Sequence, residues 1–211
     1  MAADSGTVVP SGLTARQRLV KRAFDVVGAA AGLLVLWWLI LLAWILASVD
    51  TRANGFFVQT RIGLGGRPFS LIKIRTMRVA LGPTTSVTAG TDERITPVGR
   101  ILRRTKIDEL PQLINVLVGD MSFVGPRPDV PGYADRLEGD VRVVVAVRPG
   151  ITGSASLQYR DEERLLASVA DPEAYNREVI FPDKVRINKE YVRTWSFFRD
   201  VKLIWRTVTE S

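Results

Sequence analysis

The hydrophobic positions of the chain are concentrated in one early segment. Residues 26–49 contain no charged side chain and lie between Asp25 and Asp50. As a helix at ~1.5 Å per residue, this run would be about 36 Å long, enough to cross a bilayer. We therefore predict a membrane-anchoring helix over residues 15–50, in preference to the buried helix of a soluble protein or a cleaved signal peptide. Three tryptophans, a residue typical of membrane interfaces, lie in the run: Trp37, Trp38 and Trp44.

After the apolar run, the pattern indicates short strands first and helices later. Residues 56–59 and 69–75 are rich in β-branched and aromatic side chains and flank a glycine-containing turn at 63–68, which predicts a β-hairpin. Residues 141–147 suit either a strand or a buried helical segment. From residue 161 onward, acidic and basic residues alternate with Leu and Ala, as in a solvated helix. These elements predict an α+β fold that is mostly helical.

Two further helical segments carry a single apolar stripe. Residues 108–117 and 191–207 could lie at a membrane interface or pack in a core, because one stripe serves either purpose. Residues 81–92 are rich in Gly, Thr and Ser and predict a mobile surface loop. We expect three parts along the chain: a flexible tail at 1–14, the anchor at 15–50 and a catalytic domain at 51–211.

Composition narrows the chemistry that the chain can perform. The 211 residues include no histidine and no cysteine, which excludes an imidazole base, a thiolate nucleophile, disulfides and Cys/His zinc sites. A catalytic metal should therefore be a hard cation held by oxygen, with Mg²⁺ favoured if phosphates share the site. The net charge of +7 indicates an anionic partner. Nucleic acid is disfavoured, because the basic residues are dispersed and no nucleic-acid-binding motif is present.

The segment 105–128 joins two adjacent carboxylates to an arginine between prolines. Thr105 is a candidate helix N-cap, which places Asp108 at capping-box spacing and Glu109 in the first turn. Taken alone, these acids would be ordinary first-turn residues that complement the helix dipole. Arg127 lies between two prolines that restrict its backbone, so its guanidinium could bind a phosphate with two hydrogen bonds. An exposed loop arginine is the ordinary alternative.

The whole block resembles the bacterial sugar transferases, which move a sugar-1-phosphate from a nucleotide diphosphate sugar onto a polyprenyl phosphate. The resemblance is to the small monotopic phosphoglycosyl transferases and extends from about residue 19 to residue 208. It is carried by several blocks in the order of the family: Lys-Ile-Arg-Thr-Met at 73–77, Thr-Pro-Val-Gly-Arg at 96–100, Asp-Glu at 108–109, Arg-Pro-Gly-Ile-Thr-Gly at 148–153 and Tyr-Val-Arg at 191–193.

The resemblance implies a catalytic role for the Asp-Glu pair. Asp108 would attack the sugar-bearing phosphate, release a nucleoside monophosphate and pass the sugar phosphate to undecaprenyl phosphate. Glu109 would bind Mg²⁺, with Asp108 as a second ligand. Phosphate-binding candidates are Arg127, Lys73, Arg75 and Arg148, of which Lys73 and Arg75 would share a strand face. The positions where the family's nucleotide contacts are expected are Gln158 and Arg160.

The family topology is a re-entrant helix with both ends on the cytoplasmic face of the bacterial inner membrane. Basic residues flank the apolar run on both sides, which fits that topology. Many small members break this helix with a Ser-Pro pair, but Trp37 and Trp38 occupy the matching position here, so no proline forces a kink. We expect the partners to be a nucleotide diphosphate sugar, undecaprenyl phosphate and membrane lipids, and the sequence leaves a homo-oligomer open.

Two rival functions fit part of this pattern. A membrane-bound, magnesium-dependent phosphodiesterase would use the same carboxylates but hand the phosphate to water. A non-enzymatic basic scaffold, anchored in the membrane, would bind acidic lipid or nucleic acid and would not need Asp108. We expect the transferase, which would initiate an exopolysaccharide, an O-antigen or another glycoconjugate. The sequence does not identify the sugar or the base of the nucleotide.

Overall fold

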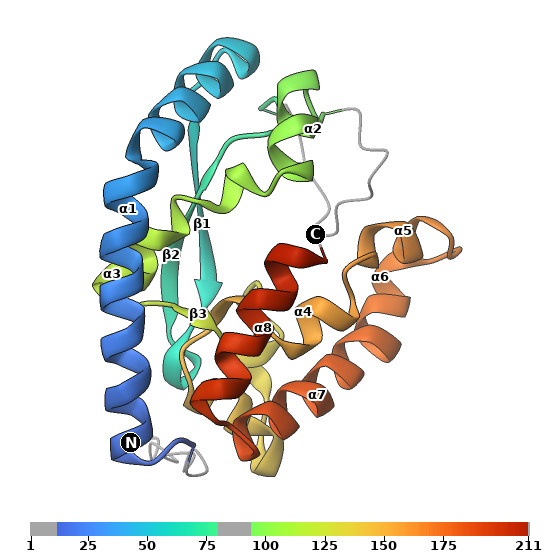
Figure 1. Ribbon diagram of the computed structural model, residues 1–211. Coiled ribbons are helices and arrows are strands. Elements are labelled where there is room, and N and C mark those ends of the chain that lie inside the picture. The colour runs from blue at the N-terminus through green and yellow to red at the C-terminus, as the bar shows by residue number, and fades with distance from the viewer. Residues whose placement is uncertain (1–11, 80–93, 211) are drawn as a thin grey trace, which may run out of the picture.

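The computed structural model describes residues 12–79 and 94–210 and is dominated by one long helix, α1 (Ala15–Thr51). Thr14 begins the helix through a reciprocal capping box with Gln17, and Arg52 ends it in the left-handed conformation. The helix has 37 residues and continues through Trp37 and Trp38 without a break. It is long and apolar enough to cross a membrane by length and composition. Figure 1 shows α1 along one whole edge of the molecule.

The predicted β-hairpin is confirmed. Strands β1 (Phe56–Ile62) and β2 (Pro68–Ile74) pair antiparallel along their full length. The connecting 3-10 turn η1 (Leu64–Gly66) contains Gly65 and Gly66 at φ of 71° and 80°, a region that glycine enters without strain. One side of the hairpin packs on α1 and α3, where Leu71 meets Ala29 and Ile74 meets Ile40.

The helix predicted from Thr105 onward is divided in the structure. Helix α2 (Pro97–Arg104) begins at the N-cap Thr96 and ends at Thr105, so the prediction of Thr105 as an N-cap is wrong. Lys106 then adopts a left-handed conformation, and Asp108 lies in the one-turn 3-10 helix η2 (Ile107–Glu109). Pro111 has no N–H to continue that turn, and α3 (Gln112–Val118) begins directly after it.

The second half of the domain is helical around a two-stranded parallel pair, β3 (Ser122–Val124) and β4 (Gly150–Thr152). Residues 141–147, expected as a strand or a buried helix, lie mostly in the 3-10 helix η4 (Gly139–Ala146), with η3 (Ala134–Arg136) before it. The helices predicted beyond residue 161 are confirmed. They are α5 (Glu162–Ala167), α6 (Pro172–Tyr175), a π-helical turn (Asn176–Ile180), α7 (Phe181–Arg193) and α8 (Phe197–Thr209). The short helix α4 (Ser154–Gln158) precedes them.

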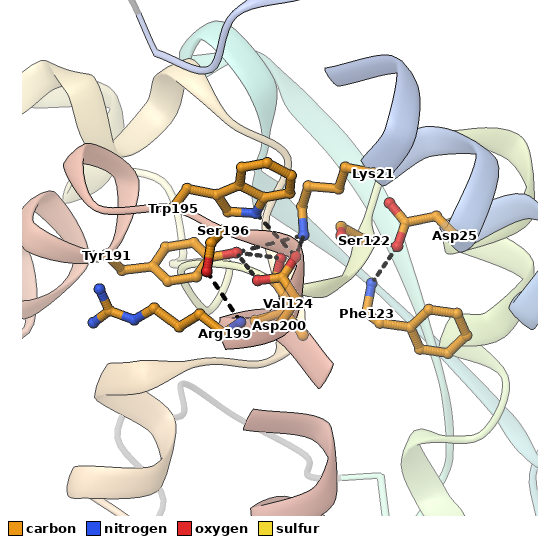
Figure 2. A network of polar contacts seen from close by, with 10 residues as sticks. All are labelled: Lys21, Asp25, Ser122, Phe123, Val124, Tyr191, Trp195, Ser196, Arg199 and Asp200. Atoms are coloured by element: carbon orange, nitrogen blue, oxygen red, sulfur yellow. Dashed lines mark hydrogen bonds and ion pairs between the residues drawn. The ribbon is translucent and has the colours of Figure 1, made fainter. Parts of the chain in front are cut away.

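A buried polar network joins the start of α1 to α7 and α8 (Figure 2). Lys21 Nζ lies 2.5 Å from Asp200 Oδ2, and the Tyr191 hydroxyl donates to Asp200 Oδ1 over 2.7 Å. The Trp195 indole donates to the same carboxylate over 3.0 Å. One helical turn further along α1, Asp25 accepts a hydrogen bond from the Phe123 backbone N–H. The Tyr-Val-Arg block therefore contributes a structural residue, because Tyr191 is 1% exposed and helps to hold α1.

Two predicted segments fall wholly or largely outside the described residues. These are the flexible tail, of which only residues 12–14 are described, and the loop at 81–92.

Candidate active site

Asp108 is a buried carboxylate with one free oxygen. The residue is 7% exposed, and its Oδ1 has no hydrogen-bond partner among the residues that the structure describes. Burial, helped by the neighbouring Glu109 carboxylate, raises the pKa of Asp108 to about 6 against the opposing charges of Lys73, Arg103 and Lys106. At neutral pH the group is therefore mostly an anion with an unsatisfied oxygen, as a carboxylate nucleophile requires.

Glu109 is held by two cations on a single oxygen. Its Oε1 lies 2.6 Å from Arg127 Nη2 and 3.1 Å from Lys73 Nζ. Burial alone would raise the pKa of Glu109, but the two cations hold it well below its usual value. Glu109 in turn raises the pKa of Arg127, whose side chain is 46% exposed. The arginine can therefore keep one side on Glu109 and present the other to a ligand.

The loop that carries Arg127 is fixed by neighbouring strands. Gly125 begins it, and a Cβ at this position would lie 2.4 Å from the carbonyl oxygen of Arg148, so only glycine fits beside β4. At the other end, the Ile62 N–H donates to the Asp129 carbonyl over 2.9 Å, and Arg61 Nη1 donates to the Pro128 carbonyl over 3.2 Å. The end of β1 thus holds the backbone on the far side of Arg127.

The predicted nucleotide residues lie beside a pocket. Gln158 and Arg160 line a cavity of about 430 Å³ together with Glu162 and Glu210. The Arg160 guanidinium contacts both the carbonyl and the carboxylate of Glu210. Glu162 pairs with Lys184 over 2.5 Å and also acts electrostatically on Arg127. Glu162 therefore links this pocket electrostatically to Arg127, the cation that Glu109 holds.

The structure does not bring Arg75 and Arg148 to this site. Arg75 donates to the Asn54 carbonyl over 2.7 Å and lies over the Phe57 ring. Arg148 donates to the Gly119 carbonyl over 2.7 Å, at the C-terminal end of α3. Positive charge is stabilising there, because the last carbonyls of a helix have no intrahelical partner. Both arginines have structural partners, and their predicted contacts with phosphate find no support in these positions.

The carboxylates of Asp108 and Glu109 are compatible with a Mg²⁺ ion whose other ligands are water and substrate phosphates. Within residues 12–79 and 94–210, no group of three or more acidic residues is arranged to hold a metal by itself. Mg²⁺ in phosphate chemistry usually takes only one or two carboxylates and completes its shell with water and substrate phosphates. Asp108 and Glu109 offer that number of carboxylates.

Comparison with known proteins decides the family. The model of the bacterial sugar transferases matches residues 16–211. The chain belongs to this family. The UDP-glucose:undecaprenyl-phosphate glucose-1-phosphate transferase of Caulobacter vibrioides is 41% identical over 194 residues, which cover 90% of this chain and 68% of that protein. The protein of the same name from Escherichia coli is 36% identical over 203 residues, or 93% of this chain and 41% of that protein. The exopolysaccharide production protein PSS of Rhizobium leguminosarum bv. phaseoli is 37% identical over 198 residues, with coverage of 90% and 94%.

The membership confirms the resemblance drawn from the sequence, and the structure adds two residues to the candidate site. Arg61 lies close enough to interact electrostatically with Arg127 and Glu109. Asp129 lies near Arg61 and Lys184, and burial raises its pKa to about 6. Asp129 directly follows Pro128 in the sequence, which could have drawn attention to it. Arg61 gave no comparable signal, because its place depends on the pairing of β1 with the loop.

Proposed function

We propose that this chain transfers a sugar-1-phosphate from a UDP-sugar to undecaprenyl phosphate and thereby initiates an exopolysaccharide or related glycoconjugate. The observation that carries the proposal is the buried, unpartnered oxygen of Asp108 beside a Glu109 that holds two cations. The names of the relatives supply the reaction class, because two of the proteins described above are glucose-1-phosphate transferases acting on undecaprenyl phosphate.

The first half of the reaction is a displacement at phosphorus by Asp108. A carboxylate oxygen of Asp108 attacks the phosphorus that carries the sugar and forms an acyl phosphate. The bond from that phosphorus to the bridging oxygen breaks, and its electron pair leaves with UMP. The free Oδ1 supports this role, since the attacking oxygen has no hydrogen bond within the described chain to give up.

The second half regenerates the carboxylate. A phosphate oxygen of undecaprenyl phosphate attacks the same phosphorus, and the acyl phosphate bond breaks. The products are undecaprenyl diphosphate sugar and the free Asp108 anion, so no other reactant is needed. A raised pKa of about 6 suits the attack, because the group is charged at neutral pH and is more nucleophilic than a carboxylate of ordinary pKa.

Two cations and a metal ion would serve charge neutralisation. Arg127 is the exposed cation of the cluster, so it binds the phosphate under attack while Glu109 holds its other side. Lys73 keeps Glu109 ionised from within the hairpin. Asp108 and Glu109 would hold Mg²⁺, which when bound supplies further neutralisation of phosphate charge.

The pocket at the start of α5 is our candidate for the nucleoside. Gln158 offers both donors and acceptors to a base, and Arg160 offers a cation to a phosphate or a ribose hydroxyl. The apolar segment of α1 would anchor the enzyme to the inner membrane, with the catalytic domain at the cytoplasmic face where nucleotide sugars are available.

A single-turnover assay tests the proposal. The purified chain in detergent is incubated with UDP-glucose carrying ³²P in the β-phosphate and with Mg²⁺, without acceptor. We expect UMP release to stop at one equivalent while the label stays on the protein, and hydroxylamine to remove it as an acyl phosphate. Undecaprenyl phosphate should then discharge the label into lipid. Continuous release of sugar phosphate without acceptor would instead identify a phosphodiesterase, and a panel of UDP-sugars identifies the donor.

A further inference from the structure

Asp129 is a carboxylate beside the candidate active site whose side chain has no hydrogen-bonding partner in the described chain. It makes no hydrogen bond or ion pair with residues 12–79 or 94–210, and only its backbone carbonyl is engaged, by the Ile62 N–H. The residue is partly buried, and its oxygens are not enclosed as Oδ1 of Asp108 is. A carboxylate that is withdrawn from water without protein donors, yet open at the surface, is suited to accept hydrogen bonds from a ligand.

The charges around Asp129 balance one another. Burial raises the pKa of Asp129 to about 6 against the opposing charges of Lys184 and Arg61. Glu162 is near enough to raise this pKa as well. Two acids and two bases leave no net charge at this position, so the surroundings suit a neutral polar ligand better than a phosphate. The two cations also oppose the binding of a metal ion.

The side chains at this position can both accept and donate hydrogen bonds. Lys184 Nζ lies 2.5 Å from Glu162 Oε2, and an ammonium has three donors, so this pair leaves donors for a ligand. Arg61, by contrast, donates to the Pro128 carbonyl over 3.2 Å and thereby supports the loop. Asp129 thus offers acceptors beside the donors of Lys184. That combination matches hydroxyl groups, which donate and accept at the same oxygen.

Asp129 also lies at a suitable distance from the proposed phosphate site. It follows Arg127 by two positions, with Pro128 between them. Because a proline disfavours the helical conformation in the residue before it, this stretch is extended, and two residues then cover about 7 Å. Arg127 acts electrostatically on Asp129, so the two side chains are near each other. The sugar of the donor is joined to the phosphate through one oxygen, which places its far hydroxyls about one sugar ring away from Arg127.

We propose that Asp129 and Lys184 recognise the hydroxyl groups of the donor sugar, with Asp129 as the hydrogen-bond acceptor and Lys184 as a donor that Glu162 orients. This inference rests on the proposed function and extends it from the reaction at phosphorus to the choice of sugar. A charged acceptor in a partly buried position discriminates strongly, because a sugar without the matching hydroxyl leaves the acceptor unpaired.

Donors that each lack one hydroxyl test this contact. The full-length chain in detergent receives undecaprenyl phosphate, Mg²⁺ and either the UDP-sugar with the highest kcat/KM in the panel described above or a deoxy form of that sugar. Release of UMP gives kcat/KM for each donor. Asp129→Asn removes the charge and keeps the size, and Lys184→Gln removes the ammonium. Asp171→Asn is the matched control, because Asp171 is the N-cap of α6 and asparagine caps a helix equally well.

The native chain should lose about 10- to 100-fold in kcat/KM with at least one deoxy donor, the loss expected for one charged hydrogen bond. Asp129→Asn should lose a similar factor with the complete sugar and nothing further with that deoxy donor. Lys184→Gln should likewise lose nothing further with one of the deoxy donors. Inhibition by UMP, which carries no sugar, should not weaken in either variant, and Asp171→Asn should behave as the native chain does.

Losses that multiply for Asp129→Asn and every deoxy donor would show that Asp129 binds no hydroxyl and would overturn the proposal. Inhibition by UMP that weakens in proportion to kcat/KM would assign Asp129 to holding the loop of Arg127, and would overturn it too. A native chain that accepts all deoxy donors equally refutes the proposal without any variant, so the test does not depend on the folding of the variants. If the native chain releases no UMP from any UDP-sugar, the proposed function itself has failed.

Discussion

Two clusters of buried charge in this protein are built from similar side chains and differ in how completely they are satisfied. In the anchor cluster, Asp200 accepts hydrogen bonds from Lys21, Tyr191 and Trp195. In the catalytic cluster, Glu109 accepts both of its cations on Oε1, whereas Asp108 Oδ1 has no partner in the described chain. The anchor cluster is therefore closed, and the catalytic cluster is open at one carboxylate oxygen.

The difference indicates that the catalytic cluster serves the reaction and the anchor cluster serves the stability of the fold. A buried polar atom without a partner costs about 1–3 kcal/mol, so its retention at Asp108 points to chemistry rather than to stability. A closed ionic network, by contrast, leaves no atom for a substrate. Its members hold α1 against α7 and α8, and removing one of them leaves another charge buried.

The largest expected effect is the loss of transfer in Asp108→Asn. The amide keeps the shape of the side chain but cannot attack phosphorus, so kcat should fall by at least about 1,000-fold. The variant should fold normally by circular dichroism, since it removes a desolvated charge. Glu173→Gln, an exposed acid on α6, is the matched control and should retain full activity. Transfer within tenfold of the native rate would reject Asp108 as the nucleophile.

Breaking the anchor cluster should affect stability first. Lys21→Met leaves the Asp200 carboxylate buried without its cation, which should lower the free energy of unfolding by about 3–5 kcal/mol. The double variant Lys21→Met with Asp200→Asn should recover part of that loss, because no charge is then left unpaired. Thermal unfolding in detergent compares the three proteins. If the single and double variants are equally destabilised, packing rather than charge dominates at this position.

Arg127→Lys changes the catalytic cluster and leaves the anchor cluster unchanged. Lysine retains the charge but cannot hold Glu109 and a phosphate with one planar group, so kcat/KM should fall by about 10- to 100-fold, the effect of losing one charged hydrogen bond. Arg75→Lys is the control, because Arg75 had the same predicted role yet contacts the Asn54 carbonyl. Equal losses in the two variants would place Arg75 in the site and give it a role beyond its contact with the Asn54 carbonyl.

Local patterns in the sequence were enough to predict the hairpin, the apolar helix and the Asp-Glu pair. Alternation of side chains and turn glycines act over a few residues, so they can be interpreted without the fold. The helix boundary at Thr105 could not be predicted in this way. It depends on Lys106 in the left-handed conformation, which places Asp108 in a turn of its own between α2 and α3.

The features of the site that the sequence did not predict depend on contacts between distant segments. Lys73 reaches Glu109 across 36 positions, and Lys21 reaches Asp200 across 179. Sequence alone gave Arg148 and Lys73 the same predicted role, but Lys73 contacts Glu109, whereas Arg148 donates to the Gly119 carbonyl. Likewise, the apolar run of α1 predicted an anchor, while the buried and the exposed sides of this helix became distinct only once the domain was in place.

The smallest expected effect is a pH dependence that distinguishes the two clusters. The folded pKa of Asp108 is about 6, above an unfolded value of about 4. The folded state therefore binds more protons between these values, and this group makes the protein less stable as pH rises from about 4 to about 6. The cost is fully present above the folded pKa. Asp108→Asn lacks it, so the variant should gain stability relative to the native chain with rising pH, by an amount on the order of 2 kcal/mol.

Activity should rise with pH, whereas the stability contribution of Asp108 falls, because only the ionised carboxylate attacks phosphorus. Between pH 7 and pH 5, kcat/KM should fall by roughly tenfold as Asp108 becomes protonated. Glu109 should not contribute in this range, since Lys73 and Arg127 hold its pKa well below its usual value. Unfolding curves and transfer rates measured on the same samples check both trends. A stability difference between the two proteins that does not change with pH would mean that the Asp108 carboxylate carries no desolvation cost, and the contrast with the closed anchor cluster would then be lost.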